Sequence, residues 1–375
     1  MTEHVVQGRL VLDDQVEAGA ITIVDDRIVG IEPAPSHVDG PYLAPGFVDV
    51  HVHGWGGHDA MGDLGALDSM AQSLLRRGVT SFLPTAVTAP VAALVEFAER
   101  VRGWIPAAPA DGAQPLGFNL EGPFLAPARR GAHDPTHLRV PADVSWAELE
   151  PLLGGLRLVT LAPELPGALE LIGWLRAAGV AVSIGHSSAT FDEARAGYAA
   201  GATSTTHLFN AMTGIDHRAP GLAVAALVDD AIYVELIADG VHVDPGLWPI
   251  VTRTKPSDRL LLVSDAVALA GLGDGRTRLG GLDVEVVGER ITLAGTTTLA
   301  GSVIALDSAV RNLVGSGVGI PAAVAAASRN PLAMLGVSDR GRIAVGQLAD
   351  LVELDDALSV RRVMRAGSWF AGEAA

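Results

Sequence analysis

The strongest constraint on the fold of this chain is a repeated alternation between short β-branched or apolar runs and longer Ala/Leu-rich runs of helical character. Repeated strand–helix units with buried strands indicate a parallel sheet, and eight such units indicate closure into a (β/α)8 barrel of the TIM type. An open doubly wound sheet is the alternative, but no GxGxxG motif follows the first strand. The predicted strands are 47–52, 79–84, 116–121, 157–162, 180–184, 202–206, 232–237 and 260–264, with helical runs such as 67–78, 92–104 and 168–179 between them.

Both ends of the chain are β-rich and differ from the middle. Residues 5–12 and 20–33 show apolar alternation around an Asp-Asp turn, and 341–356 with 360–370 resemble them. Each end is too small to hide a core alone, so we expect the two to pair in a small β-sandwich domain. The predicted division is therefore 1–45 plus 340–375 for this domain and 46–339 for the barrel, with an inserted hairpin near 276–300 and outer helices at 304–315 and 321–335.

Composition excludes several classes of protein. Hydrophobic residues make up 49% of the 375 residues, which is enough for a large core. The formal net charge of -17 argues against nucleic-acid binding, because phosphate neutralisation needs clustered cations. There is no cysteine, so disulfides and thiolate metal sites are excluded. The start of the chain lacks the basic and apolar regions of a signal peptide, and no run is apolar enough for a membrane span; we expect a cytoplasmic protein without membrane partners.

Histidine and acidic residues stand where most of the predicted strands end. In a (β/α)8 enzyme the functional residues gather at the carboxyl ends of the strands. Alternation along the first strand also points both of its imidazoles to one side. A single histidine at a strand end usually only satisfies a hydrogen bond, but six such strand ends together indicate a common site. The residues are His51 and His53, Glu121, His186, His207, Asp239 to His242, and Asp265.

Four imidazoles and a carboxylate form a nitrogen and oxygen ligand set that suits a divalent metal, with zinc the first choice and iron, cobalt or manganese as alternatives. Such a metal polarises a carbonyl and lowers the pKa of its water. A carboxylate at the end of the eighth strand, Asp265, can take a proton from that water and return it to a leaving nitrogen. The predicted chemistry is hydrolysis of an amide or a related C–N bond. Asp265 could instead cap the helix that follows.

This layout resembles the amidohydrolase superfamily. Many of its two-metal members bridge the ions with a carboxylated lysine at the end of strand four, but here that strand ends Leu-Ala-Pro-Glu, and the single lysine, Lys255, precedes strand eight. The closer resemblance is to the N-acetylglucosamine-6-phosphate deacetylases and covers nearly the whole chain. It rests on PGFVDVHVHGWGG, NLEGPF, RRGAHDP, SIGHSSAT, THLFNAM, ADGVHV, LVSDA, LAGS, RNPLAMLG and GQLADLV, in this order.

The resemblance implies a role for each group of site residues. Glu121, His186 and His207 would hold the principal metal, and Asp265 would be the general base and then the general acid. His51 and His53 match the motif of members that take a second metal, so one or two ions per subunit are expected. The implied substrate contacts are Ala132 and His133 at the N-acetyl sugar, Asn210, Ala211 and Arg218 at the 6-phosphate, and Asp239, Gly240, Val241, His242, Leu299, Ala300 and Gly301 along the sugar pocket.

The resemblance also implies a reaction: metal-dependent hydrolysis of N-acetyl-D-glucosamine 6-phosphate to D-glucosamine 6-phosphate and acetate, in amino-sugar catabolism or cell-wall recycling, by a homodimer. Arg218 would grip the phosphate through its forked donors. A deacetylase acting on N-acetylgalactosamine 6-phosphate or another N-acyl compound is the first alternative. A non-catalytic binding protein on the same fold is a remote one, because such a protein would be expected to have lost ligands, and all are present here.

Overall fold

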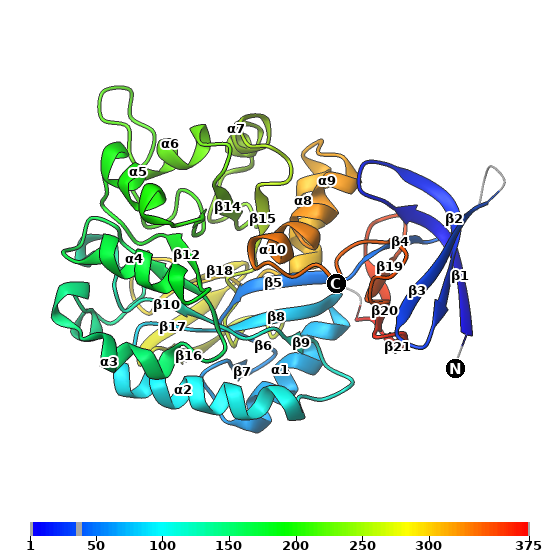
Figure 1. Cartoon of the computed structure of the whole chain (residues 1–375), viewed down its shortest axis with the longest axis horizontal. Helices are drawn as coiled ribbons and strands as arrows, with labels where there is room; N and C mark the ends of the chain where they lie inside the picture. The colour runs from blue at the N-terminus through cyan, green and yellow to red at the C-terminus, as the bar shows by residue number, and fades with distance from the viewer. Residues whose placement is uncertain (1–2, 35–39, 374–375) are drawn as a thin grey trace.

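Eight parallel strands form a nearly closed barrel in the computed structural model, which describes residues 3–34 and 40–373 (Figure 1). The strands follow one another around the barrel in chain order, and β9 (Gln114–Pro115) adds a short pairing beside β8. The N–H of Asp265, just after the last strand, donates to the carbonyl of His51 on the first at 2.9 Å. The barrel strands are β5 (Phe47–Val52), β8 (Val79–Ala86), β10 (Phe118–Glu121), β11 (Leu156–Leu161), β12 (Ala181–Ile184), β13 (Ser204–Thr205), β14 (Tyr233–Leu236) and β15 (Leu260–Leu262).

Each barrel strand overlaps the run predicted for it, so the predicted fold class is confirmed. Helices cover the outside of the strands, and the apolar faces of both are buried together in one large core. The helices are α1 (Leu64–Arg76), α2 (Val91–Trp104), α3 (Trp146–Leu149), α4 (Ala168–Ala177), α5 (Phe191–Ala200), α6 (Leu222–Val228), α7 (Trp248–Thr254), α8 (Leu306–Gly315), α9 (Ile320–Ala326) and α10 (Arg329–Met334). Short 3-10 turns lie at Ile105–Ala107, Pro127–Arg129, Pro135–His137, Pro141–Asp143, Glu150–Leu152 and Pro245–Leu247.

The helical run predicted at 321–335 is interrupted in the structure. It forms α9 and α10 with a break around Ser328, whose backbone angles are not helical. Pro331 has no N–H to donate to the carbonyl four residues earlier, so the helical hydrogen bonds cannot run on from α9 into α10. The break also lets Asn330 turn inward, where its side-chain amide donates to the carbonyls of Ser257 and Leu260 at 2.8 Å each and ties α10 to the start of β15.

The two chain ends pair with each other, as the sequence predicted, and the β-sandwich expected from them takes the form of one seven-stranded sheet (Figure 1). Its order is β21-β20-β19-β4-β1-β2-β3, so C-terminal β19 pairs with N-terminal β4. Residues from both ends share one apolar core, for example Leu10, Ile21 and Leu351. The division into domains after residues 45 and 339 stays a prediction. The strands are β1 (Glu3–Val11), β2 (Val16–Val24), β3 (Arg27–Pro33), β4 (Tyr42–Pro45), β19 (Leu351–Leu354), β20 (Val360–Arg365) and β21 (Ser368–Ala371).

The insertion predicted near 276–300 is a three-stranded antiparallel sheet: β16 (Gly275–Leu279), β17 (Leu282–Val287) and β18 (Arg290–Leu293). Its apolar face packs with Val87 and Val267 from two loops at the carboxyl end of the barrel. A two-stranded ribbon, β6 (Gly54–Trp55) with β7 (His58–Asp59), lies directly after β5. No helix among the described residues is long and apolar enough to cross a membrane.

Candidate active site

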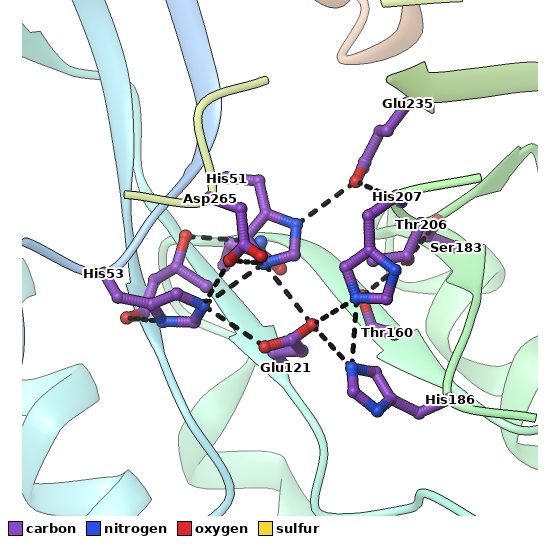
Figure 2. A network of polar contacts seen from close by, with 12 residues as sticks. His51, His53, Glu121, Thr160, Ser183, His186, Thr206, His207, Glu235 and Asp265 are labelled. Atoms are coloured by element: carbon purple, nitrogen blue, oxygen red, sulfur yellow. Dashed lines mark hydrogen bonds and ion pairs between the residues drawn. The ribbon is translucent and has the colours of Figure 1, made fainter. Parts of the chain in front are cut away.

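The predicted metal ligands converge at the carboxyl end of the barrel (Figure 2). They come from five different places in the chain, yet the donor atoms of neighbouring members lie 2.9 to 3.5 Å apart, and each residue is almost completely buried. The first strand, β5, supplies two imidazoles because alternate residues of a strand face the same side. The members are His51 and His53 at β5, Glu121 at the end of β10, His186 after β12, His207 after β13 and Asp265 after β15.

One trio of donor atoms consists of Glu121 Oε1, His186 Nε2 and His207 Nε2. The carboxylate oxygen lies 3.0 Å from the His186 nitrogen and 2.9 Å from the His207 nitrogen, and the two nitrogens are 3.0 Å apart. Donor atoms bound to a common zinc ion at about 2.0–2.1 Å lie roughly 3.3 Å apart in a tetrahedral site. The trio is slightly tighter than that, and its residues match the three expected to hold the principal metal.

A second trio lies beside the first and consists of His51 Nε2, His53 Nε2 and Asp265 Oδ1. The two nitrogens are 3.3 Å apart, and the Asp265 oxygen lies 3.5 Å from His51 and 3.2 Å from His53. Glu121 stands between the trios: its Oε1 belongs to the first, and its Oε2 lies 3.2 Å from His53 Nε2. The two trios could hold one or two divalent cations, and Glu121 has an oxygen facing each trio.

Hydrogen bonds on the far side of the rings support metal binding. The Nδ1 atom of His51 lies 3.1 Å from a carboxylate oxygen of Glu235. The Nδ1 atom of His53 lies 3.1 Å from the carbonyl oxygen of Thr85, and that of His186 lies 2.8 Å from the carbonyl oxygen of Arg129. These oxygens can only accept, so in the neutral rings Nδ1 carries the proton and Nε2 offers a lone pair to the centre. Such outer contacts are usual for metal-ligating histidines.

His133 has the opposite arrangement. The backbone N–H of Thr88 donates to its Nδ1 at 3.2 Å, so a neutral ring carries its proton on Nε2. That nitrogen lies 3.2 Å from Glu121 Oε2 and donates to it. In this tautomer His133 is a hydrogen-bond donor to Glu121, although its Nε2 lies close enough to Glu121 and His186 to join a metal-binding group with them.

The centre is strongly polarised. Burial opposes ionisation of Glu121, but the surrounding imidazoles, His51 first, outweigh it and hold the pKa of the carboxyl well below its usual range. Burial also opposes a charge on His53, yet hydrogen bonds to Asp265 and Glu121 raise the pKa of its imidazole to about 9. At His186, by contrast, burial outweighs the attraction of Glu121 and lowers the pKa of the imidazole to about 4, so this ring is held neutral with a lone pair for a metal.

The backbone bends sharply at three of the strand ends. His186, His207 and Asp265 have φ angles of 48°, 27° and 51°, a region that residues with side chains seldom adopt. This geometry turns each side chain towards the centre as the chain leaves its strand. Such strain gathers at functional sites, where the surrounding structure holds it in place. Gly301, at a φ of 70°, passes so close that a Cβ would lie 2.8 Å from the carbonyl oxygen of Asp265.

A cavity of about 490 Å³ opens from the metal centre. Several residues predicted to contact the substrate line it: Ala132, His133, Asn210, Ala211, His242, Leu299 and Gly301. Others lie outside its wall. Ala300 is buried against the inserted sheet, and the carboxylate of Asp239 binds the His242 ring at 2.7 Å and the N–H groups of Val241 and His242 at 2.8 Å. The loop that includes Gly240 thus fixes the orientation of His242.

The cations of the cavity are not those expected from the sequence. Arg218 is exposed and does not line the cavity of its own chain, whereas Arg129 and Arg130, just before the predicted Ala132 and His133, do. Glu235, which is completely buried on β14, was likewise not predicted from the sequence. The consecutive arginines of the RRGAHDP stretch were a visible signal for the first pair. For Glu235, the signal was the presence of an acidic residue inside the otherwise apolar IYVELI run.

Comparison with known proteins places the chain in a family. The model of the amidohydrolase family matches residues 42–370. An N-acetylgalactosamine-6-phosphate deacetylase from Escherichia coli O157:H7 is 39% identical over 99% of both chains. An N-acetylglucosamine-6-phosphate deacetylase from Bos taurus is 42% identical over 88% of this chain and 83% of its own length.

Solved structures agree with these relatives. The N-acetylglucosamine-6-phosphate deacetylase of Thermotoga maritima superposes with a TM-score of 0.92 at 34% identity, covering 98% of this chain and 100% of its own. A variant of the Mycobacterium smegmatis enzyme in complex with N-acetyl-D-glucosamine-6-phosphate gives 0.90 at 37% identity, covering 98% and 99%. With the family model, the relatives and the metal centre in agreement, this chain belongs to the amidohydrolase family, alongside its amino-sugar-phosphate deacetylases.

Proposed function

We propose that this protein hydrolyses the acetamide of N-acetyl-D-glucosamine 6-phosphate, giving D-glucosamine 6-phosphate and acetate. The observation that carries the proposal is the junction of the Glu121–His186–His207 trio with Asp265 at the bottom of one cavity. It occurs in a chain whose relatives in cattle and Bacillus subtilis, 42% and 35% identical, are named for this reaction.

Different residues of the site would bind the metal, transfer the proton and contact the substrate. A divalent metal held by the trio, with zinc our first choice, would supply Lewis-acid polarisation of the acetyl carbonyl and an acidified water. Asp265 would take the proton of the attacking water and pass it to the departing amine nitrogen. Its Oδ1 faces His51 and His53, and Oδ2 takes no part in those contacts and remains for the proton. His133, which lines the cavity, would contact the N-acetyl sugar.

The phosphate would be held by guanidinium groups, whose forked donors match its oxygens. We keep Arg218 as the principal anchor. Its exposed position outside the cavity of its own chain suits a homodimer in which the loop of one subunit approaches the phosphate bound in the other. Arg129 and Arg130 line the cavity and would attract the anion into it. A cytoplasmic location, the homodimer and the pathway stay predictions.

A second candidate substrate has its own support. The E. coli relative, which matches 99% of this chain at 39% identity, is named for N-acetylgalactosamine 6-phosphate. This sugar carries the same acetamide and phosphate groups and differs in the configuration of one hydroxyl. The metal centre and Asp265 would act on either epimer, so any preference resides in the cavity wall.

The experiment that tests the proposal is acetate release from N-acetylglucosamine 6-phosphate by the purified protein, its metal-depleted form and the form reloaded with zinc. We expect fast release, its loss after depletion and its return on reloading. A zinc-loaded protein that releases no acetate from either sugar phosphate would contradict the proposed reaction. Metal analysis of the same samples gives the ions per chain.

A further inference from the structure

Glu235 is a buried acidic residue that the fold itself does not require. It lies on β14 inside the barrel and is 0% exposed. The residues on either side of it, Val234 and Leu236, are apolar and pack into the main core. An ionised carboxylate in such a place is strongly disfavoured unless hydrogen bonds or opposite charges compensate it. The contacts of Glu235 therefore indicate why an acid is kept there.

The carboxylate of Glu235 contacts one residue of each ligand trio, His51 and His207 (Figure 2). Its Oε2 lies 3.1 Å from His51 Nδ1 and accepts the backbone N–H of His207 at 3.2 Å. Its other oxygen, Oε1, is buried without a hydrogen-bond partner. Among the described residues, the one imidazole that this carboxylate binds is the His51 ring.

The hydrogen bond fixes which nitrogen of His51 faces the metal centre. A carboxylate oxygen can only accept, so Nδ1 must hold the proton and Nε2 must present its lone pair. With Nε2 so placed, His51, His53 and Asp265 form a trio whose edges are 3.3, 3.5 and 3.2 Å. These edges agree with the roughly 3.3 Å expected between donors about 2.0–2.1 Å from one ion.

We propose that Glu235 is a positioning residue that controls cation binding at the second ligand trio, formed by His51, His53 and Asp265. Glu235 acts through His51: it holds the ring in the ligating tautomer and adds a negative charge beneath it. The first position depends on it less, because Glu235 contacts only the backbone of His207 there. The inference rests on the metal-binding part of the proposed function and not on the identity of the sugar.

Two substitutions separate the charge from the hydrogen bond. Glu235→Gln keeps the shape and an oxygen that can accept from His51 but removes the charge. Glu235→Leu removes both. Ser183→Ala is the matched control, because Ser183 is equally buried in the barrel and hydrogen-bonds to Thr206 rather than to a metal ligand. Circular dichroism and the thermal midpoint establish that each variant is folded.

The measurement is zinc titration of the metal-depleted proteins by equilibrium dialysis, with metal and protein quantified in the same sample. Wild type and Ser183→Ala should bind two ions per chain. In Glu235→Gln the second ion should bind about tenfold more weakly or worse, in Glu235→Leu more weakly still, and the first ion should change by less than about threefold. Cobalt(II) absorption gives a second readout, since loss of one site removes part of the d–d spectrum.

Three results would overturn the inference: a wild type that binds one ion under excess zinc, a Glu235→Gln variant that binds both ions as tightly as wild type, or a folded variant that loses both ions equally. If Glu235→Leu does not fold, Glu235→Gln alone decides. The outcome is independent of the proposed reaction. Two bound ions without acetate release would refute the proposed reaction and leave the role of Glu235 intact. Acetate release by a protein whose Glu235→Gln variant binds metal like wild type would refute the role of Glu235 and leave the reaction intact.

Discussion

The histidines of the centre differ in which ring nitrogen carries the proton, and this difference separates ligands from a donor. His53 and His186 face carbonyl oxygens with Nδ1, so Nε2 is free for a metal. His133 accepts the N–H of Thr88 with Nδ1, so its Nε2 donates. The Nδ1 partners of these rings thus distinguish the ligand positions from the donor position.

Replacement of Asp265 by asparagine tests its role as the proton carrier. Asparagine retains the Oδ1 atom near His53 but cannot take a proton, so we expect kcat to fall by about 10²- to 10⁴-fold. The Glu121–His186–His207 trio is untouched, and at least one metal ion per chain should remain. Steady-state kinetics with metal analysis of the same preparation provides the check. Loss of all metal would show that Asp265 serves mainly to hold the ion.

The arginines make separate predictions about phosphate binding. Arg218→Ala should raise KM for the sugar phosphate by roughly 10- to 100-fold with little change in kcat, because charge-assisted hydrogen bonds to the anion are lost. Arg130→Ala, at the cavity wall, should have a smaller effect that fades as salt screens its charge. If Arg130→Ala raises KM and Arg218→Ala does not, the anchor lies in the loop before Ala132.

At the scale of the elements, the eight strands and the ends at which the ligands stand could be predicted from sequence, because alternation and burial are local patterns. The interruption between α9 and α10 was missed because the Ala-rich composition outweighed Pro331. The third strand of the insertion was missed because it depends on packing against Val87 and Val267.

Glu235 and Arg129 were missed for a related reason: their roles follow from neighbours that are distant in sequence.

Lys255, the single lysine, ties two elements together. It follows α7, is buried, and donates from Nζ to the carbonyl of Ala226 at 3.1 Å and to that of Asp229, both at the C-terminal end of α6. Lys255→Met would leave these carbonyls without their donor and should lower the free energy of unfolding by about 1–3 kcal/mol. Lys255→Arg, which keeps donors, is the control.

The same lysine predicts a dependence of stability on pH. Burial lowers the pKa of Lys255 to about 8 from 10.5, so between these values the unfolded chain binds this proton and the folded protein releases it. Stability then rises with pH in that window. Thermal midpoints should therefore show the advantage of wild type over Lys255→Met growing from pH 8 to 10. An advantage that shrinks over this range would contradict the assignment.

At the scale of the molecule, a chain with a net charge of -17 must bind an anionic sugar in a centre built around carboxylates. Two features reconcile these facts. Cations bound between Glu121 and the histidines would neutralise the centre, and arginines stand at the cavity wall. The terminal sheet lies at one side of the barrel, where β4 leads directly into β5 and so into the first ligands (Figure 1).

The most direct measurement of the central claim is kcat/KM for three substrates: N-acetylglucosamine 6-phosphate, N-acetylgalactosamine 6-phosphate and unphosphorylated N-acetylglucosamine. We expect the highest value for N-acetylglucosamine 6-phosphate, with the value for the unphosphorylated sugar lower by at least about tenfold because charge-assisted contacts to the phosphate are missing. A higher value for the galactosamine epimer would assign the cavity to the other sugar. Equal values with and without the phosphate would contradict a sugar-phosphate deacetylase.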